Sequence, residues 1–247
     1  MIHTLRFLIR ASLALVWVIA GLLHIALAFP LLRLSGRLYS KKIWSVVLLR
    51  ICGVSVTQSG TPVTQGPVLF VVNHVSWLDI FILNCARATA FVAKSEIRHW
   101  PLIGWLAHGA DTIFIERASR HAVHKVGVAM QEHFERGQSV GLFPEGTTSR
   151  GDRLLPFYAN LFEPARKAGA VIQPVVLKYY HHGRRSDFAA FVGEQTLLHN
   201  MWCVLGSTGT AIEMIFVPVI WDGQGEPPVR AELSRSAHQQ MDQILLS

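Results

Sequence analysis

The chain has 247 residues, of which 51% are hydrophobic and 16% charged. This composition excludes an intrinsically disordered protein, and the length fits one α/β domain plus an attachment segment. The net charge of +7 and the pI near 9.7 indicate an anionic partner, either nucleic acid or a membrane surface. The cysteines Cys52, Cys85 and Cys203 are odd in number and widely spaced, which argues against a disulfide framework and favours a reducing compartment.

The first predicted element is an apolar helix. The run Ala11–Leu32 contains no Asp, Glu, Lys or Arg, and as a helix it would extend roughly 33 Å, about the hydrocarbon thickness of a bilayer. We interpret it as a membrane-attachment helix that either spans the bilayer or dips in and returns at Pro30. Two alternatives stay open: a secretory signal cleaved near Ala26-Leu27-Ala28, and a buried core helix.

A basic segment, Arg33–Gly53, follows the apolar run. Its composition is typical of an amphipathic helix in the headgroup layer, with Trp44 as an interface anchor, although an ordinary packing helix is the alternative. Basic residues after an apolar run favour the cytoplasmic side, so we expect attachment to the inner (cytoplasmic) membrane with the following domain facing the cytoplasm. Residues 1–57 are thus predicted to be attachment helices and residues 58–247 an α/β domain. The sequence has no zinc-finger, RNP-type or helix-turn-helix pattern, which argues against nucleic acid.

Beyond a turn-rich linker at residues 60–67, strand and helix patterns alternate. Strands are predicted at residues 68–72, 89–93, 112–115, 139–143, 171–177, 188–192 and 212–217. Helices are predicted at residues 77–86, 97–107, 120–136, 159–168, 195–205 and 230–245. This alternation predicts a mostly parallel sheet covered by helices on both faces. Ligands of such sheets bind at the carboxyl ends of the strands, where the polar clusters of this chain lie.

The stretch NHVSWLD, residues 73–79, places a histidine and a carboxylate five positions apart between a predicted strand and a predicted helix. One interpretation is structural: Ser76 would cap the helix and Asp79 would take a capping-box position. The other interpretation is catalytic. Asp79 would accept the Nδ1 proton of His74 and hold the ring, which leaves Nε2 as a general base. The positive helix terminus would favour the neutral imidazole that a base needs.

The sequence offers that base no recognisable internal nucleophile. It has no Gly-x-Ser-x-Gly elbow, H-E-x-x-H pair, C-x-x-C pair or Gly-Lys-Thr phosphate loop, so activation of a substrate hydroxyl is favoured and no metal is expected.

Polar residues also follow two further predicted strands: Glu116 and Arg117 in FIERAS, and Glu145, Gly146 and Thr147 in FPEGTTSRG. Arg117 suits phosphate or carboxylate recognition, and Glu145 can accept from a substrate hydroxyl. Gly146 permits a close approach of the backbone. Taken singly, the first cluster is equally consistent with a surface ion pair and the second with a tight turn.

The ordered set NHVSWLD, FIER, FPEGT and QPVVL resembles the motif blocks of the glycerolipid acyltransferase family, membrane-bound enzymes that include the 1-acylglycerol-3-phosphate acyltransferases. The resemblance covers about Val68 to Leu177. It implies transfer of a fatty acyl group from acyl-coenzyme A or acyl carrier protein to a lysolipid hydroxyl, without a cofactor. It also implies roles for the residues of these blocks: His74 as the base, Asp79 as its orienting partner, Arg117, Glu145, Gly146 and Thr147 as acceptor-binding residues, and Asn73, Glu116 and Pro174 as supporting residues.

The acceptor favoured by the resemblance is 1-acylglycerol-3-phosphate, which would yield phosphatidic acid. The sequence departs from the family pattern at Glu116, where aspartate is common, at Thr148, often arginine, and at Tyr158, where many members carry lysine. Fewer cations at the acceptor end keep lyso-ornithine lipid, the acceptor of similar bacterial enzymes, as an alternative. Two hypotheses from other classes are a membrane-bound thioesterase or hydrolase in which His74 activates water, and a membrane-surface binding module without turnover.

Overall fold

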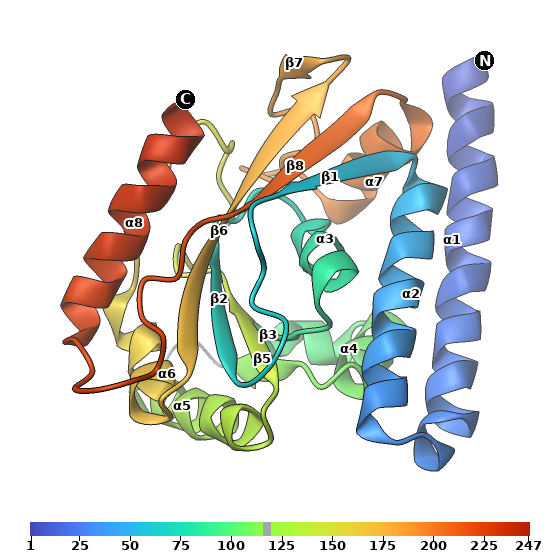
Figure 1. Cartoon of the computed structure of the whole chain (residues 1–247). Coiled ribbons are helices and arrows are strands. Elements are labelled where there is room, and N and C mark those ends of the chain that lie inside the picture. Colours follow the sequence, from blue (N-terminus) through green and yellow to red (C-terminus); the bar gives the residue numbers. More distant parts are fainter. Residues whose placement is uncertain (116–119) are drawn as a thin grey trace.

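The computed structural model describes residues 1–115 and 120–247, and a mixed sheet forms its centre (Figure 1). The strands are β1 (Val54–Ser59), β2 (Val68–Val72), β3 (Ala90–Lys94), β4 (Ile113–Ile115), β5 (Ser139–Leu142), β6 (Val171–His181), β7 (Arg184–Arg185) and β8 (Thr210–Phe216). Their order is β1-β8-β6-β2-β5-β3-β4, with β7 attached to β6. β6 runs antiparallel to β7 and β8, whereas the other paired neighbours are parallel. The prediction of a mostly parallel sheet is confirmed.

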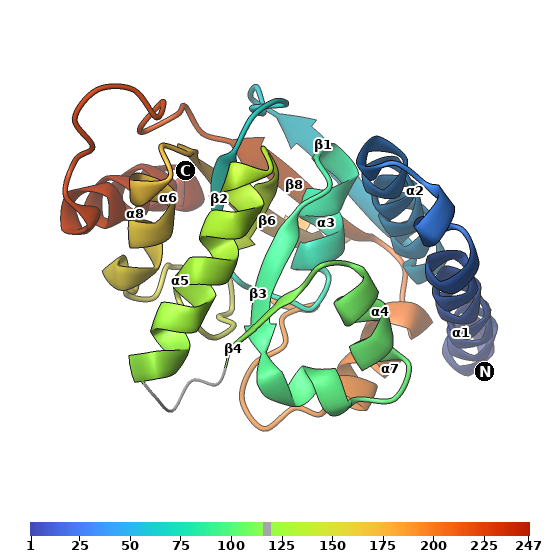
Figure 2. The same cartoon turned by 90° about the horizontal axis from the view of Figure 1, so that it is seen from below.

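Helices cover both faces of this sheet. They are α1 (Ile2–Leu27), α2 (Leu34–Cys52), α3 (Asp79–Ala86), α4 (Ile103–Gly109), α5 (Arg120–Glu135), α6 (Glu163–Lys167), α7 (Leu197–Gly206) and α8 (Arg230–Leu246), with short 3-10 turns at η1 (Phe29–Leu31), η2 (Ser95–His99) and η3 (Ala159–Phe162). α2, α3 and α7 cover one face with α1 outside them, and α5, α6 and α8 cover the other (Figures 1 and 2). Each face therefore has its own buried apolar cluster.

β2 lies at the centre of the sheet because its whole sequence is apolar. All of its residues are completely buried, as expected for a parallel strand that is covered on both faces. β5 and β6 pair with its two sides in parallel, and the register sets Val72 against Val175. β6 therefore continues past the end of β2 and runs beside the loop that follows it. Residues from three neighbouring strands converge on residues 73–79.

β1 and the segment at residues 188–192 differ from the sequence-based expectation, and the helix expected at residues 97–107 is divided into η2 and α4. The sequence pattern does not predict β1, which pairs with β8 along its whole length, and the boundary expected at residue 57 falls inside this strand. The strand predicted at residues 188–192 is wrong, because this segment is a loop. Its backbone groups find partners outside any ladder: the N–H of Phe191 donates to the carbonyl of Val75 (2.8 Å), and the carbonyl of Ala190 accepts from the Asn200 side chain (3.0 Å).

α1 and α2 form a helical hairpin that turns at η1 (Figure 1). Two indoles tie the helices together, since Trp17 Nε1 donates to the carbonyl of Trp44 (3.1 Å) and Trp44 Nε1 to that of Trp17 (3.2 Å). The structure shows α2 as a helix that packs on the domain, the alternative given above, and its place in the headgroup layer stays a prediction. Trp44 is packed between Trp17 and Phe81 of α3, and several cations of α2 donate to protein carbonyls: Arg37 to Phe29 and Leu32, Lys41 to Ala110 and Lys42 to Ala86.

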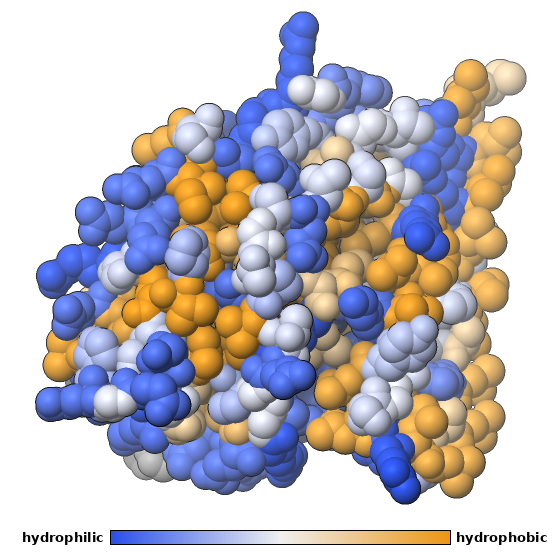
Figure 3. Space-filling view, viewed as in Figure 1, coloured by the Kyte–Doolittle hydropathy of each residue, from blue (hydrophilic) through white to orange (hydrophobic). Residues whose placement is uncertain are grey.

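α1 is the outermost helix, and its polarity is the reverse of that of a soluble amphipathic helix. Its inner face carries Arg6 and Arg10, which donate to carbonyls at the end of α7, and His3 and Phe7, which contact Trp202. Its outer face exposes large apolar side chains over its whole length: Leu5, Leu8, Ile9, Leu13, Leu15, Val16, Ile19, Leu23 and Leu27. They form the apolar edge in Figure 3. The stretch Ile2–Leu31 is long and apolar enough to cross a membrane by length and composition.

Close contact between α1 and α2 depends on Gly21, because a Cβ at this position would lie 2.5 Å from Nε1 of Trp44. We expect Gly21→Val to separate the helices and to lower the free energy of unfolding by roughly 1–3 kcal/mol, the usual cost of overpacking. Thermal unfolding in detergent micelles would measure the loss. Ala20→Val, on the exposed side of the same turn, is the control, and equal melting temperatures for both variants would contradict the close packing.

Candidate active site

The loop between β2 and α3 brings His74 and Asp79 into contact. Nδ1 of His74 lies 2.8 Å from Oδ2 of Asp79. Asp79 is the first residue of α3 and is completely buried, whereas the His74 side chain is 21% exposed. A carboxylate at Nδ1 fixes the tautomer in which Nε2 carries the free lone pair. Within the described part of the chain, Nε2 has no hydrogen-bond partner, so it is available to a ligand.

Asp79 also accepts from the backbone of its own loop. The N–H groups of Val75 (2.7 Å) and Ser76 (2.9 Å) donate to Oδ2, and the hydroxyl of Tyr179 on β6 donates to Oδ1 (2.5 Å). The alternative of a Ser76 helix cap is not what the structure shows. The helix begins after Leu78, no side chain caps it, and the hydroxyl of Ser76 has no partner among the described residues. Asp79 therefore organises the loop as well as the histidine ring.

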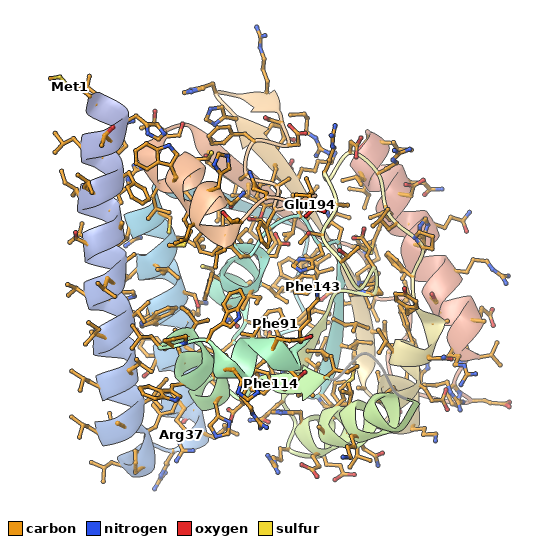
Figure 4. The ribbon with its side chains drawn as sticks, turned by 180° about the vertical axis from the view of Figure 1, so that it is seen from behind. Met1, Arg37, Phe91, Phe114, Phe143 and Glu194 are labelled. Carbon is orange, nitrogen blue, oxygen red and sulfur yellow. The ribbon has the colours of Figure 1, made fainter. Side chains whose placement is uncertain are left out.

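Aromatic rings support the other side of His74. Its imidazole stacks on the Phe143 ring at 4.1 Å between centroids and 14° between planes, and Phe143 stacks in turn on Phe91. Phe143 and Phe91 lie near the middle of the face seen in Figure 4, with Glu194 above them and Phe114 of β4 below. This stacking limits the rotation of the ring, which stays partly exposed.

Glu145 connects the loop between β2 and α3 to the segment after β5. Oε1 accepts from the N–H of His74 (2.8 Å) and Oε2 from the N–H of Leu155 (3.0 Å). Burial raises the pKa of Glu145, while these two backbone donors and His74 act against the shift. The side chain is only 4% exposed and both of its oxygens already accept, so Glu145 fixes two loops in this structure. Its predicted role in acceptor binding stays a prediction.

Gly146 and Thr147 form the turn beside Glu145. Gly146 has a φ of 69°, and a Cβ there would lie 2.8 Å from the Tyr158 ring, so both the backbone conformation and the space require glycine. Thr147 is exposed at the rim of this turn. Glu116 and Arg117 lie outside the described residues.

Asn73 and Pro174 lie between β2 and β6. The side-chain amide of Asn73 makes two hydrogen bonds with Leu177, accepting from its N–H at 2.7 Å and donating to its carbonyl at 3.1 Å. The amide replaces a backbone ladder at the point where β2 ends. Pro174 is set against Val71 and accepts from the N–H of Val217 (3.0 Å). Both residues hold β6 beside the loop between β2 and α3.

The sequence analysis does not identify Tyr179, Trp77 or Asn200 as parts of this site. Nε1 of Trp77 donates to Oδ1 of the buried Asn200 (2.8 Å), which joins the loop between β2 and α3 to α7. Tyr179 lies beyond the predicted end of the strand at Leu177. Side chains alternate along β6, so those of Leu177 and Tyr179 lie on the same face. Extending the predicted strand by two residues would therefore have identified Tyr179. Nothing in the sequence pairs Trp77 with Asn200.

Chemically, the site offers one accessible imidazole nitrogen whose partner nitrogen is held by a buried carboxylate. This arrangement can remove a proton from a hydroxyl that lies against the open side of the ring. Among the side chains that the structure describes, no group of three or more His, Cys, Asp or Glu is placed to hold a metal ion.

Comparison with known proteins gives a consistent result. The family described as Acyltransferase matches residues 53–178. The chain is 37% identical over 196 residues to a lyso-ornithine lipid O-acyltransferase of Pseudomonas aeruginosa, a match that covers 78% of this chain and 74% of that protein. It is 41% identical over 165 residues to a 1-acyl-sn-glycerol-3-phosphate acyltransferase of Neisseria gonorrhoeae, covering 65% of this chain and 64% of that protein.

One solved structure resembles the whole chain. The 1-acyl-sn-glycerophosphate (LPA) acyltransferase PlsC from Thermotoga maritima superposes with a TM-score of 0.70, covering 98% of this chain and 94% of that protein. The sequence identity is 19%, so this likeness concerns the fold.

The two hydrogen bonds of Asn73 generate a stability prediction. Asn73→Ala would leave the buried N–H and carbonyl of Leu177 without partners, at roughly 1–3 kcal/mol for each group. We expect a fall in melting temperature of about 2–4 °C for each kcal/mol lost. Asn160→Ala, at an exposed position, is the control. An unchanged melting temperature for Asn73→Ala would show that these bonds add nothing to stability.

Proposed function

Because this chain belongs to the Acyltransferase family, we propose that it moves a fatty acyl group from a thioester donor to the free hydroxyl of a lysolipid, with His74 as general base. The observation that carries the proposal is the 2.8 Å contact between His74 and the buried Asp79, which leaves Nε2 free on the open side of the ring. A thioesterase would use the same base on water, but the relatives are named for transfer to lipid acceptors.

The proposed reaction is a direct displacement. Nε2 of His74 takes the proton of the acceptor hydroxyl as its oxygen attacks the thioester carbonyl carbon. The tetrahedral intermediate then collapses, the C–S bond breaks, and the thiolate leaves with the proton held by His74. The products are the ester and a free thiol. Asp79 keeps the ring in one tautomer and stabilises the imidazolium that forms between the two steps.

In this proposal the donor is a fatty acyl thioester of coenzyme A or of acyl carrier protein. A thioester already carries an activated carbonyl, so the reaction as proposed needs no metal or bound cofactor. Positioning of the two substrates and general-base catalysis account for the rate. Arg117, Gly146 and Thr147 are proposed to bind the acceptor, on the resemblance of their motif blocks.

We propose 1-acylglycerol-3-phosphate as the acceptor, with phosphatidic acid as the product. Lyso-ornithine lipid is the second candidate, and a specific observation favours it. Tyr158, which stands where many family members carry a lysine, packs on the Gly146 turn and is 64% exposed. An aromatic side chain at this position provides less positive charge for binding a phosphomonoester than a lysine would. The relative named for lyso-ornithine lipid also covers more of this chain.

The membrane association indicated by the apolar helix is proposed to occur through the outer face of α1. Its exposed leucines form an apolar surface that only lipid or another apolar partner would cover. α1 contacts α7 near its start, through Phe7 and Trp202, and α4 near its end, where Gly109 approaches Ile25. A helix that packs on the domain at both ends lies along the membrane surface in this arrangement. The inner membrane and a cytoplasmic domain are proposed from the basic flank.

Substitution of His74 tests the mechanism. We expect His74→Ala to lower kcat/KM for acyl transfer by about 10²–10⁴, the usual contribution of a positioned base. The assay would supply an acyl thioester of coenzyme A or acyl carrier protein as donor. The acceptors would be a panel of lysolipids that includes 1-acylglycerol-3-phosphate and lyso-ornithine lipid. His182→Ala, at an exposed turn, is the matched control.

Three outcomes of this assay are decisive. Wild-type activity in His74→Ala would refute His74 as the base. Thiol release that is equally fast without any lysolipid would select the thioesterase. A preference within the panel identifies the acceptor.

Lipid attachment is tested by comparing two exposed leucines. Leu13 lies on the outer face of α1 and Leu246 at the end of α8, and each would be replaced by lysine. Burial of a leucine contributes roughly 1.5–3 kcal/mol, so we expect Leu13→Lys to weaken binding to phospholipid vesicles about tenfold or more. Leu246→Lys should bind like the wild type. Equal sedimentation of all three proteins with vesicles would contradict attachment through α1.

A further inference from the structure

The hydrogen bonds of Asp79 are divided unevenly between its two oxygens. Oδ2 accepts from His74 and from the N–H groups of Val75 and Ser76. Oδ1 accepts from the hydroxyl of Tyr179 at 2.5 Å, and within the described residues this is its one donor. A carboxylate without any surface exposure depends on such donors, because burial disfavours the charged form. The hydroxyl of Tyr179 is therefore the donor that compensates one of the two carboxylate oxygens.

Tyr179 is placed for this contact by the sheet. It lies on β6, which runs past the end of β2 beside the catalytic loop, and its side chain is 3% exposed. Burial and the charge of Asp79 both raise the pKa of Tyr179 well above its ordinary value, so the hydroxyl keeps its proton and acts as a donor. Tyr180 follows it on the opposite face of β6 and donates to Glu213 at 3.2 Å. Adjacent tyrosines thus serve different parts of the protein.

We propose that Tyr179 is a positioning residue of the active site, which sets the proton affinity of His74 through Asp79. The inference rests on the proposed function of His74 as general base. The hydroxyl holds Oδ1, which aims Oδ2 at Nδ1, and it draws negative charge away from the histidine. The ring of His74 is therefore held in one orientation, with Nδ1 against Asp79.

Few other ionisable groups face this array. From the segment after β5, the carboxyl group of Glu145 accepts from the backbone of His74 and interacts with both His74 and Asp79. The ionisable group that β6 contributes is Tyr179 itself. α7 contributes the neutral Asn200, bonded to Trp77. Among the described residues, the hydroxyl of Tyr179 is thus the one hydrogen-bond donor to the Asp79 carboxylate that comes from outside the loop between β2 and α3.

The sign of the effect follows from charge. Without the hydroxyl, the negative charge of Asp79 acts more fully on His74, which stabilises the imidazolium and raises the pKa of His74. The carboxyl group of Asp79 would also become easier to protonate. Both changes deplete the active form, neutral His74 beside ionised Asp79, at low pH. Both therefore move the acidic limb of the pH profile of kcat/KM to higher pH.

The test is Tyr179→Phe in the full chain, which keeps the ring and removes the hydroxyl. We expect the acidic limb of kcat/KM to move upward by roughly one pH unit, the size of one hydrogen bond to a buried charge. Below that limb, kcat/KM should fall about tenfold. Tyr180→Phe is the matched control, since it removes a hydroxyl from the next residue of the same strand, and its profile should coincide with that of the wild type.

A second measurement does not depend on turnover. The pKa of His74 can be followed by NMR of histidine-labelled protein in micelles, with its signal identified by its loss in His74→Gln. We expect Tyr179→Phe to raise this pKa in the wild-type background and to leave it unchanged when Asp79→Asn is also present. An unchanged pKa together with an unchanged pH profile would overturn the proposal, as would an equal shift in the Asp79→Asn background. Full activity of His74→Gln would instead overturn the proposed function.

Discussion

The active site depends on one buried carboxylate. Asp79 is completely removed from solvent, and a charge in such a place must be compensated by donors close to it. Here the donors are His74, two amides of the loop and Tyr179, which come from the loop and from a different strand. The same interactions that make burial of the charge tolerable also fix the loop conformation and the ring of His74. The stability of the loop and the orientation of the His74 ring therefore depend on the same hydrogen bonds.

The sheet determines which residues can take part. β2, β5 and β6 are neighbours and run in parallel, so the segments after β2 and β5 leave the sheet at the same edge, while β6 continues beside them. This is why Glu145 reaches the backbone of His74 and Tyr179 reaches Asp79, although they are far apart in the chain. Ligand sites at the carboxyl ends of parallel strands follow from this geometry. Here it brings His74, Asp79 and the residues that contact them together from three segments.

The helical hairpin adds a different kind of constraint. α1 buries its arginines against the end of α7 and turns its leucines outward, an arrangement that water does not favour. α7 in turn carries Asn200, which holds Trp77 of the catalytic loop. α1 and the His74–Asp79 pair are therefore connected through one intermediate helix. A lipid substrate would meet an enzyme whose apolar outer face and active site belong to a single packed unit.

The sequence by itself determined the strand and helix alternation, the parallel sheet and the His74–Asp79 pair, because these depend on local periodicity and on spacings of a few residues. Tertiary structure decided what local patterns do not contain. Apolar residues 188–192 resemble a strand but pair with no neighbouring strand, and β1 joins the sheet by pairing with β8. Lys41 and Lys42 of α2 donate to carbonyls at the ends of α4 and α3. Tyr179 became a partner of Asp79 only through the register of β6 against β2. The physical reason is that hydrogen-bond partners of buried groups are chosen by the fold, across separations that no sequence pattern encodes.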